Sequence, residues 1–269
     1  MTFQVPFMLM TDGYKPGHPA QYPELTERLY LNFTARAGRD PLDTGVIAFG
    51  LQGTIMRYFI EYANDTFFYR DEEDVCEEYE AFLGEYFGPN SIGTDHVRAL
   101  HRLGYLPLEI RAIPEGTHVP YGVPVFTIES TAGHGYAWIA SYIETLLSSL
   151  VWHAMTSATT AFQYRTTLEY WANLTGTAPE FIDWQAHDFS FRGMTSPESA
   201  MLSGAAHLTA FTGTDAVPAI PYLKTYYGAS GLIGGSVPAT EHSVMCAGGV
   251  MDSVEAETET DGGMTDPAM

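Results

Sequence analysis

The stretch from Ala186 to Ala200 constrains the fold of this chain more than any other part of the sequence. Before it, Glu180–Gln185 (EFIDWQ) alternates apolar and polar residues, which predicts a short buried strand. After it, the small residues of Ser196–Ala205 favour a helix. Strand, polar loop and helix follow one another in α/β barrels, which place functional side chains at the carboxyl ends of their strands. The sequence therefore predicts a ligand site in this loop.

The loop carries two side chains suited to binding a ligand. Phe189 can stack on a planar ring, and the guanidinium of Arg192 can donate to a carbonyl or phosphate oxygen. A purely structural interpretation is also open, in which Phe189 belongs to the core and Arg192 pairs with Asp188. Residue types alone do not decide between the two.

The pattern of a strand followed by an acid recurs further along the chain. Ala206–Thr212 is strand-like and is followed closely by Asp215. A glycine-rich turn at Gly228–Gly235 then leads to Glu241 and His242 at a third loop or helix start. The glycines match neither a Walker sequence nor a dinucleotide-binding loop, which argues against those two kinds of nucleotide site.

The residues ahead of this region predict a mixed α and β domain. Alternating apolar residues bounded by Pro and Gly indicate strands, and apolar residues at helical spacing indicate helices. The expected elements are strands at Met8–Met10 and Arg28–Ala35, helices at Gly45–Tyr62 and Asp71–Gly88, two strands within Leu106–Glu129, and helices at Tyr136–Val151 and Thr160–Leu174. The acids of the second helix are interpreted as a solvated face and not as a metal site.

Two loops of this domain present polar side chains. Asp12 and Tyr14 follow the first expected strand, and Arg36 and Arg39 follow the second. The two arginines could bind an anion, or they could pair on the surface with the aspartates that follow them.

Charge excludes one class of partner. The chain has 12 Lys and Arg against 33 Asp and Glu, a net charge of −21. A protein that binds nucleic acid needs a basic surface to displace counterions, and no segment supplies one. A surface this acidic suits a cytoplasm rich in salt, so we expect a halophilic host.

The cysteines and the apolar segments indicate a cytoplasmic protein without a membrane segment. Cys76 and Cys246 are the two cysteines of the chain, too few for a disulfide framework, and no Cys/His spacing resembles a zinc site. The N-terminus lacks the basic region and long apolar run of a signal peptide. The most apolar helix candidate, Tyr136–Met155, is interrupted by Glu144 and His153.

Four motifs in a fixed order carry a resemblance to a known family. They are TDGYK (Thr11–Lys15), HDFSFRG (His187–Gly193), GTD (Gly213–Asp215) and SVPATEHS (Ser236–Ser243). From about Phe7 to about Gly249 the chain resembles the nicotinate and nicotinamide phosphoribosyltransferase family, and within it the nicotinamide enzymes. Such enzymes join nicotinamide to phosphoribosyl pyrophosphate, forming nicotinamide mononucleotide and releasing pyrophosphate in NAD salvage.

The resemblance implies roles for the residues of these motifs. Phe189 would cover one face of the pyridine, and Tyr14 from the second subunit of a homodimer would cover the other. Asp12 and Arg36 would lie at the shared dimer site, with Arg36 on a phosphate group. Offset stacking of this kind contributes on the order of 1 kcal/mol per pair beyond burial.

The same resemblance implies how the amide is recognised. Asp215 would accept from the amide NH2, and Arg192 would donate to the amide oxygen or to the sugar phosphate. A carboxylate at Asp215 would repel the carboxylate of nicotinate, so the amide is the expected substrate.

At the phosphate end of the site, His242 resembles the family's phosphorylated histidine. It would take a phosphoryl group from ATP, with Glu241 and Ser236 in the same motif. A neutral imidazole is nucleophilic enough for this step. His242, Asp215 and Arg192 are thus the expected catalytic residues. Mg²⁺ is implied by the pyrophosphate-bearing substrate, and no protein metal ligand is predicted.

The resemblance also implies the domain organisation. Residues 1–178 would form an α+β accessory and dimerisation domain, residues 179–249 the first part of an irregular (β/α) barrel with the nicotinamide site, and residues 250–269 an acidic disordered tail. Because the barrel would be incomplete, we expect a complementing C-terminal half. Two alternatives stay open: a ligand-binding or regulatory fragment without catalysis, and a nicotinate phosphoribosyltransferase.

Overall fold

The computed structural model describes residues 4–38, 43–88 and 92–248. The chain divides into two compact units, Met1–Gly235 and Ser236–Met269, and each is described by itself. The predicted disordered tail at 250–269 lies outside the described residues, as do Arg39 and Asp40. The predicted domain boundary after residue 178 stays a prediction.

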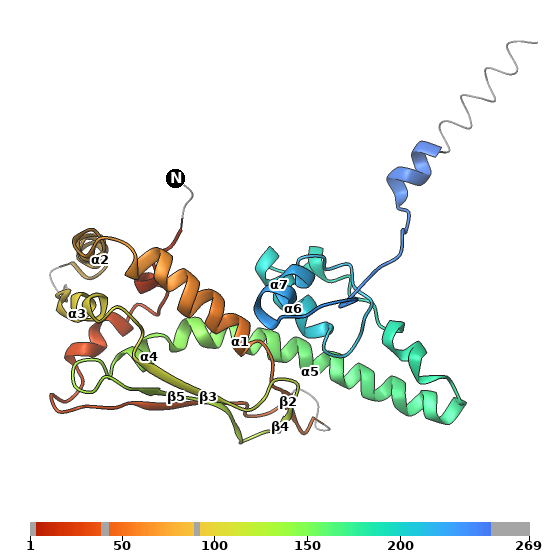
Figure 1. The fold of residues 1–269 in the computed structure, drawn as a ribbon, viewed down its shortest axis with the longest axis horizontal. Helices are drawn as coiled ribbons and strands as arrows, with labels where there is room; N and C mark the ends of the chain where they lie inside the picture. Colours follow the sequence, from red (N-terminus) through yellow and green to blue (C-terminus); the bar gives the residue numbers. More distant parts are fainter. Residues whose placement is uncertain (1–3, 39–42, 89–91, 249–269) are drawn as a thin grey trace, which may run out of the picture. The chain divides into compact units, whose positions relative to one another are not determined.

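The described part of the first unit contains two small antiparallel sheets, so it is a mixed α/β structure (Figure 1). In one sheet, β5 (Pro124–Ser130) lies between β1 (Tyr30–Thr34) and β3 (Leu108–Ala112). In the other, β2 (Gly45–Ile47) pairs with β4 (His118–Pro120). The strand predicted at Arg28–Ala35 is confirmed, and the β structure predicted within Leu106–Glu129 is present as three strands, β3, β4 and β5, where two were expected.

Helices make up most of the rest of this unit. The α-helices are α1 (Leu51–Thr54), α2 (Glu72–Phe87), α3 (Asp95–Leu103), α4 (Ile139–Tyr142), α5 (Glu144–Thr175), α6 (Pro197–His207) and α7 (Ala219–Tyr227). Two π-helical segments, Ile55–Tyr62 and Asn64–Phe68, continue α1. Short 3-10 helices lie at Phe7–Leu9, Lys15–Ala20, Pro179–Trp184 and Phe191–Gly193.

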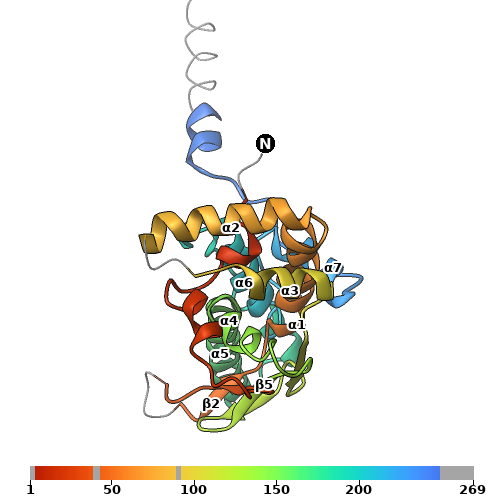
Figure 2. The ribbon, with the colours of Figure 1, turned by 90° about the vertical axis from the view of Figure 1, so that its left-hand side faces the viewer.

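The main core lies between the strands and the helices that pack over them. Both views place α4 and the first half of α5 between the strands on one side and α2 and α3 on the other (Figures 1 and 2). Fully buried side chains from three of these helices meet there, among them Leu83, Leu100 and Leu147. A second core cluster joins α5, α6 and α7, so α5 connects the sheet region to the segment around residue 188.

Three predicted strands are wrong. Met8–Met10 and Glu180–Gln185 lie largely in 3-10 helices, and Ala206–Thr212 covers the end of α6 and the turn after it. Pro179 starts one of the 3-10 helices, where its fixed φ and missing N–H fit the first turn. Within that segment Ile182 is buried and Phe181 is exposed. A single helical turn produces this alternation of buried and exposed residues, and so would a strand.

Two helix predictions also change. The segment Gly45–Tyr62 begins with β2 and becomes helical only at Leu51. The helices expected at Tyr136–Val151 and Thr160–Leu174 belong largely to one continuous helix, α5. No Gly or Pro lies between those two segments, and the hydroxyl of Thr156 donates to a carbonyl one turn earlier, so nothing stops the helix.

Candidate functional site

Three short backbone segments lie side by side in parallel and form the base of the site. Asp188 pairs with Thr214, and Gly213 pairs with Gly235, each as an isolated bridge. The N–H of Asp215 donates to the carbonyl of Asp188 at 2.8 Å. Helices α6 and α7 connect the three segments in chain order, so the residues that follow each segment emerge at the same edge.

Helix α6 begins where the loop ends. The Ser196 hydroxyl accepts from the N–H of Ser199 at 3.1 Å, and Pro197 occupies the first turn, which is the usual signature of a helix start. A Cβ on Gly204 would lie 2.7 Å from the Cβ of Ala216. The glycine therefore lets α6 pack closely against the start of the α7 segment, and this packing fixes the loop that carries Asp215.

Phe189, His187 and Asp215 form a connected group at this edge. The rings of His187 and Phe189 are stacked, with centroids 4.4 Å apart and an interplanar angle of 28°. The His187 Nε2 lies 2.9 Å from Asp215 Oδ1. Phe189 is 69% exposed, so its ring is available to a planar ligand. The structure thus brings the predicted aromatic ring and the predicted carboxylate into one assembly.

Asp188 points away from this assembly into the protein. It is only 8% exposed, its Oδ1 accepts from the N–H of Ser190 at 2.9 Å, and its Oδ2 has no hydrogen-bond partner among the described residues. Arg192 is exposed and forms no ion pair with Asp188 in the described part of the chain. The structural interpretation of Phe189 as core and Arg192 as the partner of Asp188 is therefore wrong.

His207 holds the loop at Gly213 through a hydrogen bond, and the sequence analysis did not identify it. Its Nε2 lies 3.0 Å from the carbonyl oxygen of Gly213, and its ring stacks on Phe211. Burial lowers the pKa of His207, which keeps the ring neutral and able to donate one hydrogen bond. No motif pointed to it, because its partner is a backbone carbonyl.

Asp12 and Tyr14 lie in a different part of the first unit, on a groove beside the start of α5. The groove has a volume of about 310 Å³ and is lined by Asp12, Tyr14, Lys15, Glu144, Thr145, Ser148, Ser149 and Trp152. Tyr14 is 61% exposed, and Asp12 accepts a hydrogen bond from the Thr145 hydroxyl at 2.5 Å.

Lys15 connects the loop that lines this groove to the start of α5. The sequence analysis did not predict this role, because Lys15 lies in a polar loop. The side chain is buried, and Nζ donates to the carbonyl of Ser141 and to Glu144 Oε2, both at 2.8 Å. A buried ammonium is stable only when it is paired and hydrogen-bonded in this way. The loop with Asp12 and Tyr14 is thereby tied to the start of α5.

The remaining predicted residues lie on exposed segments. Arg36 is exposed just after β1. Ser236, Glu241 and His242 belong to the second unit, where they are exposed and where residues 242–248 are helical. Within that unit the Ser243 hydroxyl donates to Glu241.

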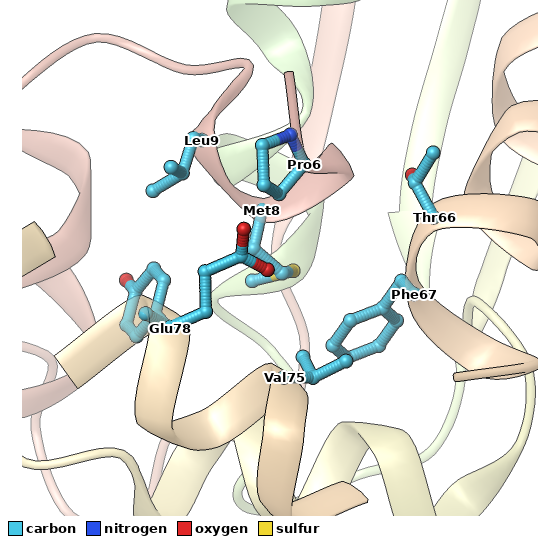
Figure 3. Close-up of a pocket in the computed structure, with 8 residues that line it drawn as sticks. Pro6, Met8, Leu9, Thr66, Phe67, Val75 and Glu78 are labelled. Atoms are coloured by element: carbon cyan, nitrogen blue, oxygen red, sulfur yellow. The ribbon is translucent and has the colours of Figure 1, made fainter. Parts of the chain in front are cut away.

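The enclosed pocket in the first unit is not a ligand site. It has a volume of about 10 Å³ and is lined by Pro6, Met8, Leu9, Thr66, Phe67, Val75, Glu78 and Tyr79 (Figure 3). That volume holds one water molecule at most.

The described residues contain no group of three or more His, Cys, Asp or Glu side chains that could hold a metal ion. Cys76 is buried and Cys246 is exposed, and neither forms a disulfide. Even the long α5 has no apolar stretch fit to span a bilayer, and this holds for every other helix in the described ranges.

Comparison with known proteins supports the expected family. Residues 184–263 match the Nicotinate phosphoribosyltransferase (NAPRTase) family. The chain is 45% identical to a nicotinamide phosphoribosyltransferase of Acinetobacter baylyi, over 97% of this chain and 52% of the relative. It is 35% identical to one of Xanthomonas campestris pv. campestris, over 93% of this chain and 50% of the relative. The predicted resemblance to the nicotinate and nicotinamide phosphoribosyltransferases is confirmed.

The family match contains three of the four motifs, including His187–Gly193 and Gly213–Asp215. The chain spans about half the length of the curated relatives it matches. Among solved structures, human nicotinic acid phosphoribosyltransferase superimposes with a TM-score of 0.56 and 20% identity, over 89% of this chain and 41% of the human chain. This likeness shows that the mixed α/β fold resembles the matching part of that structure.

Proposed function

We propose that this chain carries the nicotinamide-binding half of a nicotinamide phosphoribosyltransferase. The observation that carries the proposal is the assembly of Phe189, His187 and Asp215, which sets an exposed aromatic face beside a carboxylate. A flat pyridine with an amide substituent fits both groups. In the reaction, the pyridine nitrogen attacks C1′ of phosphoribosyl pyrophosphate, the bond from C1′ to the pyrophosphate oxygen breaks, and pyrophosphate leaves.

Asp215 selects the amide over the acid in this proposal. Its side chain is 44% exposed, and it contacts His187, whose ring stacks on the exposed Phe189. It accepts from the amide NH2 of nicotinamide and repels the carboxylate of nicotinate. Arg192, from the 3-10 helix that follows Phe189, donates to the amide oxygen or to the sugar phosphate.

Tyr14 completes the ring sandwich from a second copy of the chain. Its exposure on the groove at the start of α5 supports this role, because an exposed tyrosine can enter a neighbouring subunit. Asp12 and Arg36 lie at the same shared site, with Arg36 on a phosphate group. The protein acts as a homodimer in this account.

His242 couples the reaction to ATP. Its imidazole nitrogen attacks the γ-phosphorus, forming a P–N bond while the bond to ADP breaks. Glu241 and Ser236 belong to the same motif as His242 and act with it on the phosphate group. The described residues hold no cluster of ligands for Mg²⁺, so no step is assigned to it; the ion would enter with the pyrophosphate of the substrate.

The finer architecture belongs to the same proposal. The parallel segments at Asp188, Thr214 and Gly235, connected by α6 and α7, support the start of an irregular (β/α) barrel. Residues 1–178 serve as the accessory and dimerisation domain, and residues 179–249 carry the nicotinamide site. A complementing C-terminal half completes the barrel. The net charge of −21 and the cysteine usage support a cytoplasmic protein of a halophilic host.

Two other functions remain candidates, each on one observation. The assembly of His187, Phe189 and Asp215 is by itself a binding arrangement, which a fragment that binds its ligand without turnover would share. The solved neighbour that acts on nicotinic acid favours a nicotinate enzyme.

Turnover distinguishes these functions. The chain is mixed with the C-terminal half of the Acinetobacter relative, phosphoribosyl pyrophosphate, ATP and either pyridine, in low and in high salt. We expect nicotinamide mononucleotide from the mixture and little or none from the chain alone, because glycosyl transfer needs both substrates held in place. Product formed with nicotinate but not with nicotinamide would overturn the amide assignment. Full activity of the isolated chain would overturn the need for a second half.

A further inference from the structure

His187 touches both groups that the proposed function assigns to the pyridine. Its Nε2 lies 2.9 Å from Asp215 Oδ1, and its ring stacks on Phe189 with centroids 4.4 Å apart. A carboxylate oxygen only accepts hydrogen bonds, so Nε2 must carry the hydrogen and donate it. The side chain of His187 is only 21% exposed, whereas Phe189 is 69% exposed. Of the two stacked rings, the imidazole is the covered one.

The backbone at Gly213 leaves room for this imidazole. A Cβ built on Gly213 would lie 2.7 Å from His187 Nδ1, closer than side chains tolerate, and 3.3 Å from its Cγ. The Gly213 carbonyl accepts a hydrogen bond from His207, which fixes the backbone segment beside the His187 imidazole. Close approach, and not an unusual φ, therefore explains the glycine of the GTD motif.

We propose that His187 is a positioning residue for pyridine recognition, which rests on the proposed function. Its N–H fixes the orientation of the Asp215 carboxylate, and its ring covers one face of Phe189. The ligand ring must then stack on the opposite face of Phe189, with its amide directed to the carboxylate that His187 orients. His187 thus sets which pyridine is accepted without contacting the ligand.

Two substitutions separate the contributions of His187. His187→Phe keeps an aromatic ring against Phe189 but removes the donor to Asp215. His187→Gln keeps an N–H donor but removes the stacked ring. Affinities for nicotinamide and nicotinate are measured by calorimetric titration of the 269-residue chain.

We expect His187→Phe to weaken nicotinamide binding by about three- to tenfold, the loss typical of one hydrogen bond that is partly exposed to solvent. The preference for nicotinamide over nicotinate should fall with it, because the Asp215 carboxylate loses its contact with the imidazole. His187→Gln should weaken both pyridines and preserve the preference. Gly213→Ala should behave like His187→Phe, whereas Gly235→Ala, whose Cβ would meet its nearest atom at 3.5 Å, is the matched control.

A ligand-free measurement tests the contact itself. In proton–nitrogen correlation spectra of the histidine rings, the signal absent from His187→Phe identifies His187. We expect that signal to show the Nε2–H tautomer in the wild type and a mixture of tautomers in Asp215→Ala. Identical signals in both proteins, or an unchanged preference in His187→Phe, would overturn the proposal. If the wild type binds neither pyridine, the proposed function fails, and the ring spectrum still decides for or against His187.

Discussion

At the scale of single residues, the alternation around Asp188 explains how three neighbours in sequence take separate roles. His187 and Phe189 lie against each other on one side, and Asp188 is buried on the other. This is the arrangement expected of an extended segment, in which successive side chains point to opposite faces. The motif thus supplies one exposed aromatic ring, Phe189, one partly covered imidazole, His187, and one internal carboxylate that organises the turn through Ser190.

Replacement of Asp215 by Asn should reduce discrimination against nicotinate. The repulsive charge disappears, whereas a hydrogen-bonding group remains, so nicotinate should gain affinity relative to nicotinamide. Titration of wild type and variant with both pyridines measures the ratio of the two dissociation constants. If that ratio stayed at the wild-type value, Asp215 would not be the selector.

At the scale of elements, Glu115 joins three parts of the first unit. Its carboxylate accepts from the N–H of Gly50 at 2.9 Å, from the N–H of Gln52 at 2.7 Å and from the hydroxyl of Tyr227 at 2.9 Å. It therefore caps the start of α1 and ties it to the end of α7. Because α7 follows directly after Asp215, this contact also secures the loop of the candidate site.

Glu115→Ala should lower the free energy of unfolding by about 2 kcal/mol, because it leaves a helix start without its acceptor. Glu109→Ala is the control, since Glu109 only pairs with Arg111 on the exposed surface. That change should cost less than about 1 kcal/mol. Chemical denaturation of both variants measures the difference, and equal losses would refute the capping role.

His96 of α3 makes stability depend on pH. Burial lowers its pKa from 6.5 to about 4, and its ring packs edge-on against Trp138. The unfolded chain therefore binds the proton more tightly than the folded chain, so stability is full above pH 6.5 and is lost as pH falls towards 4. The loss from this group amounts to about 3 kcal/mol.

His96→Phe should flatten the pH dependence of stability in that interval, because the replacement keeps an apolar ring beside Trp138 and cannot be protonated. Thermal unfolding at pH 7 and at pH 4.5 measures the change for both proteins. Parallel losses of stability in wild type and variant would show that other groups are responsible.

The sequence pattern predicted elements with several apolar residues at a regular spacing better than it predicted short elements. The acidic helix α2 and the strands within Leu106–Glu129 carry several apolar residues at one period, and the structure has them. Glu180–Gln185 offers fewer than two helical turns, so alternation and a 3-10 turn predict the same buried Ile182. For the site, the motifs located Phe189 and Asp215, but only the packing of α6 and the parallel bridges bring them together.

At the scale of the whole molecule, the account depends on two copies sharing a site. Tyr14 is exposed on its groove, and Phe189 is exposed on its loop. If the two rings meet across a dimer, a mixture of Tyr14→Ala and Phe189→Ala chains should contain some dimers with one intact site. We expect each variant to bind nicotinamide more weakly by roughly 1 to 3 kcal/mol, and the mixture to recover part of the binding. Without recovery, Tyr14 would act within its own subunit.

Titration of the 269-residue chain with nicotinamide and with nicotinate tests the central claim most directly, with Phe189→Ala as the comparison. The account predicts that the wild type binds nicotinamide more tightly than nicotinate, and that Phe189→Ala loses roughly 1 to 3 kcal/mol of the binding free energy because the exposed ring is the stacking face. Tighter binding of nicotinate, or nicotinamide binding that Phe189→Ala leaves unchanged, would contradict it.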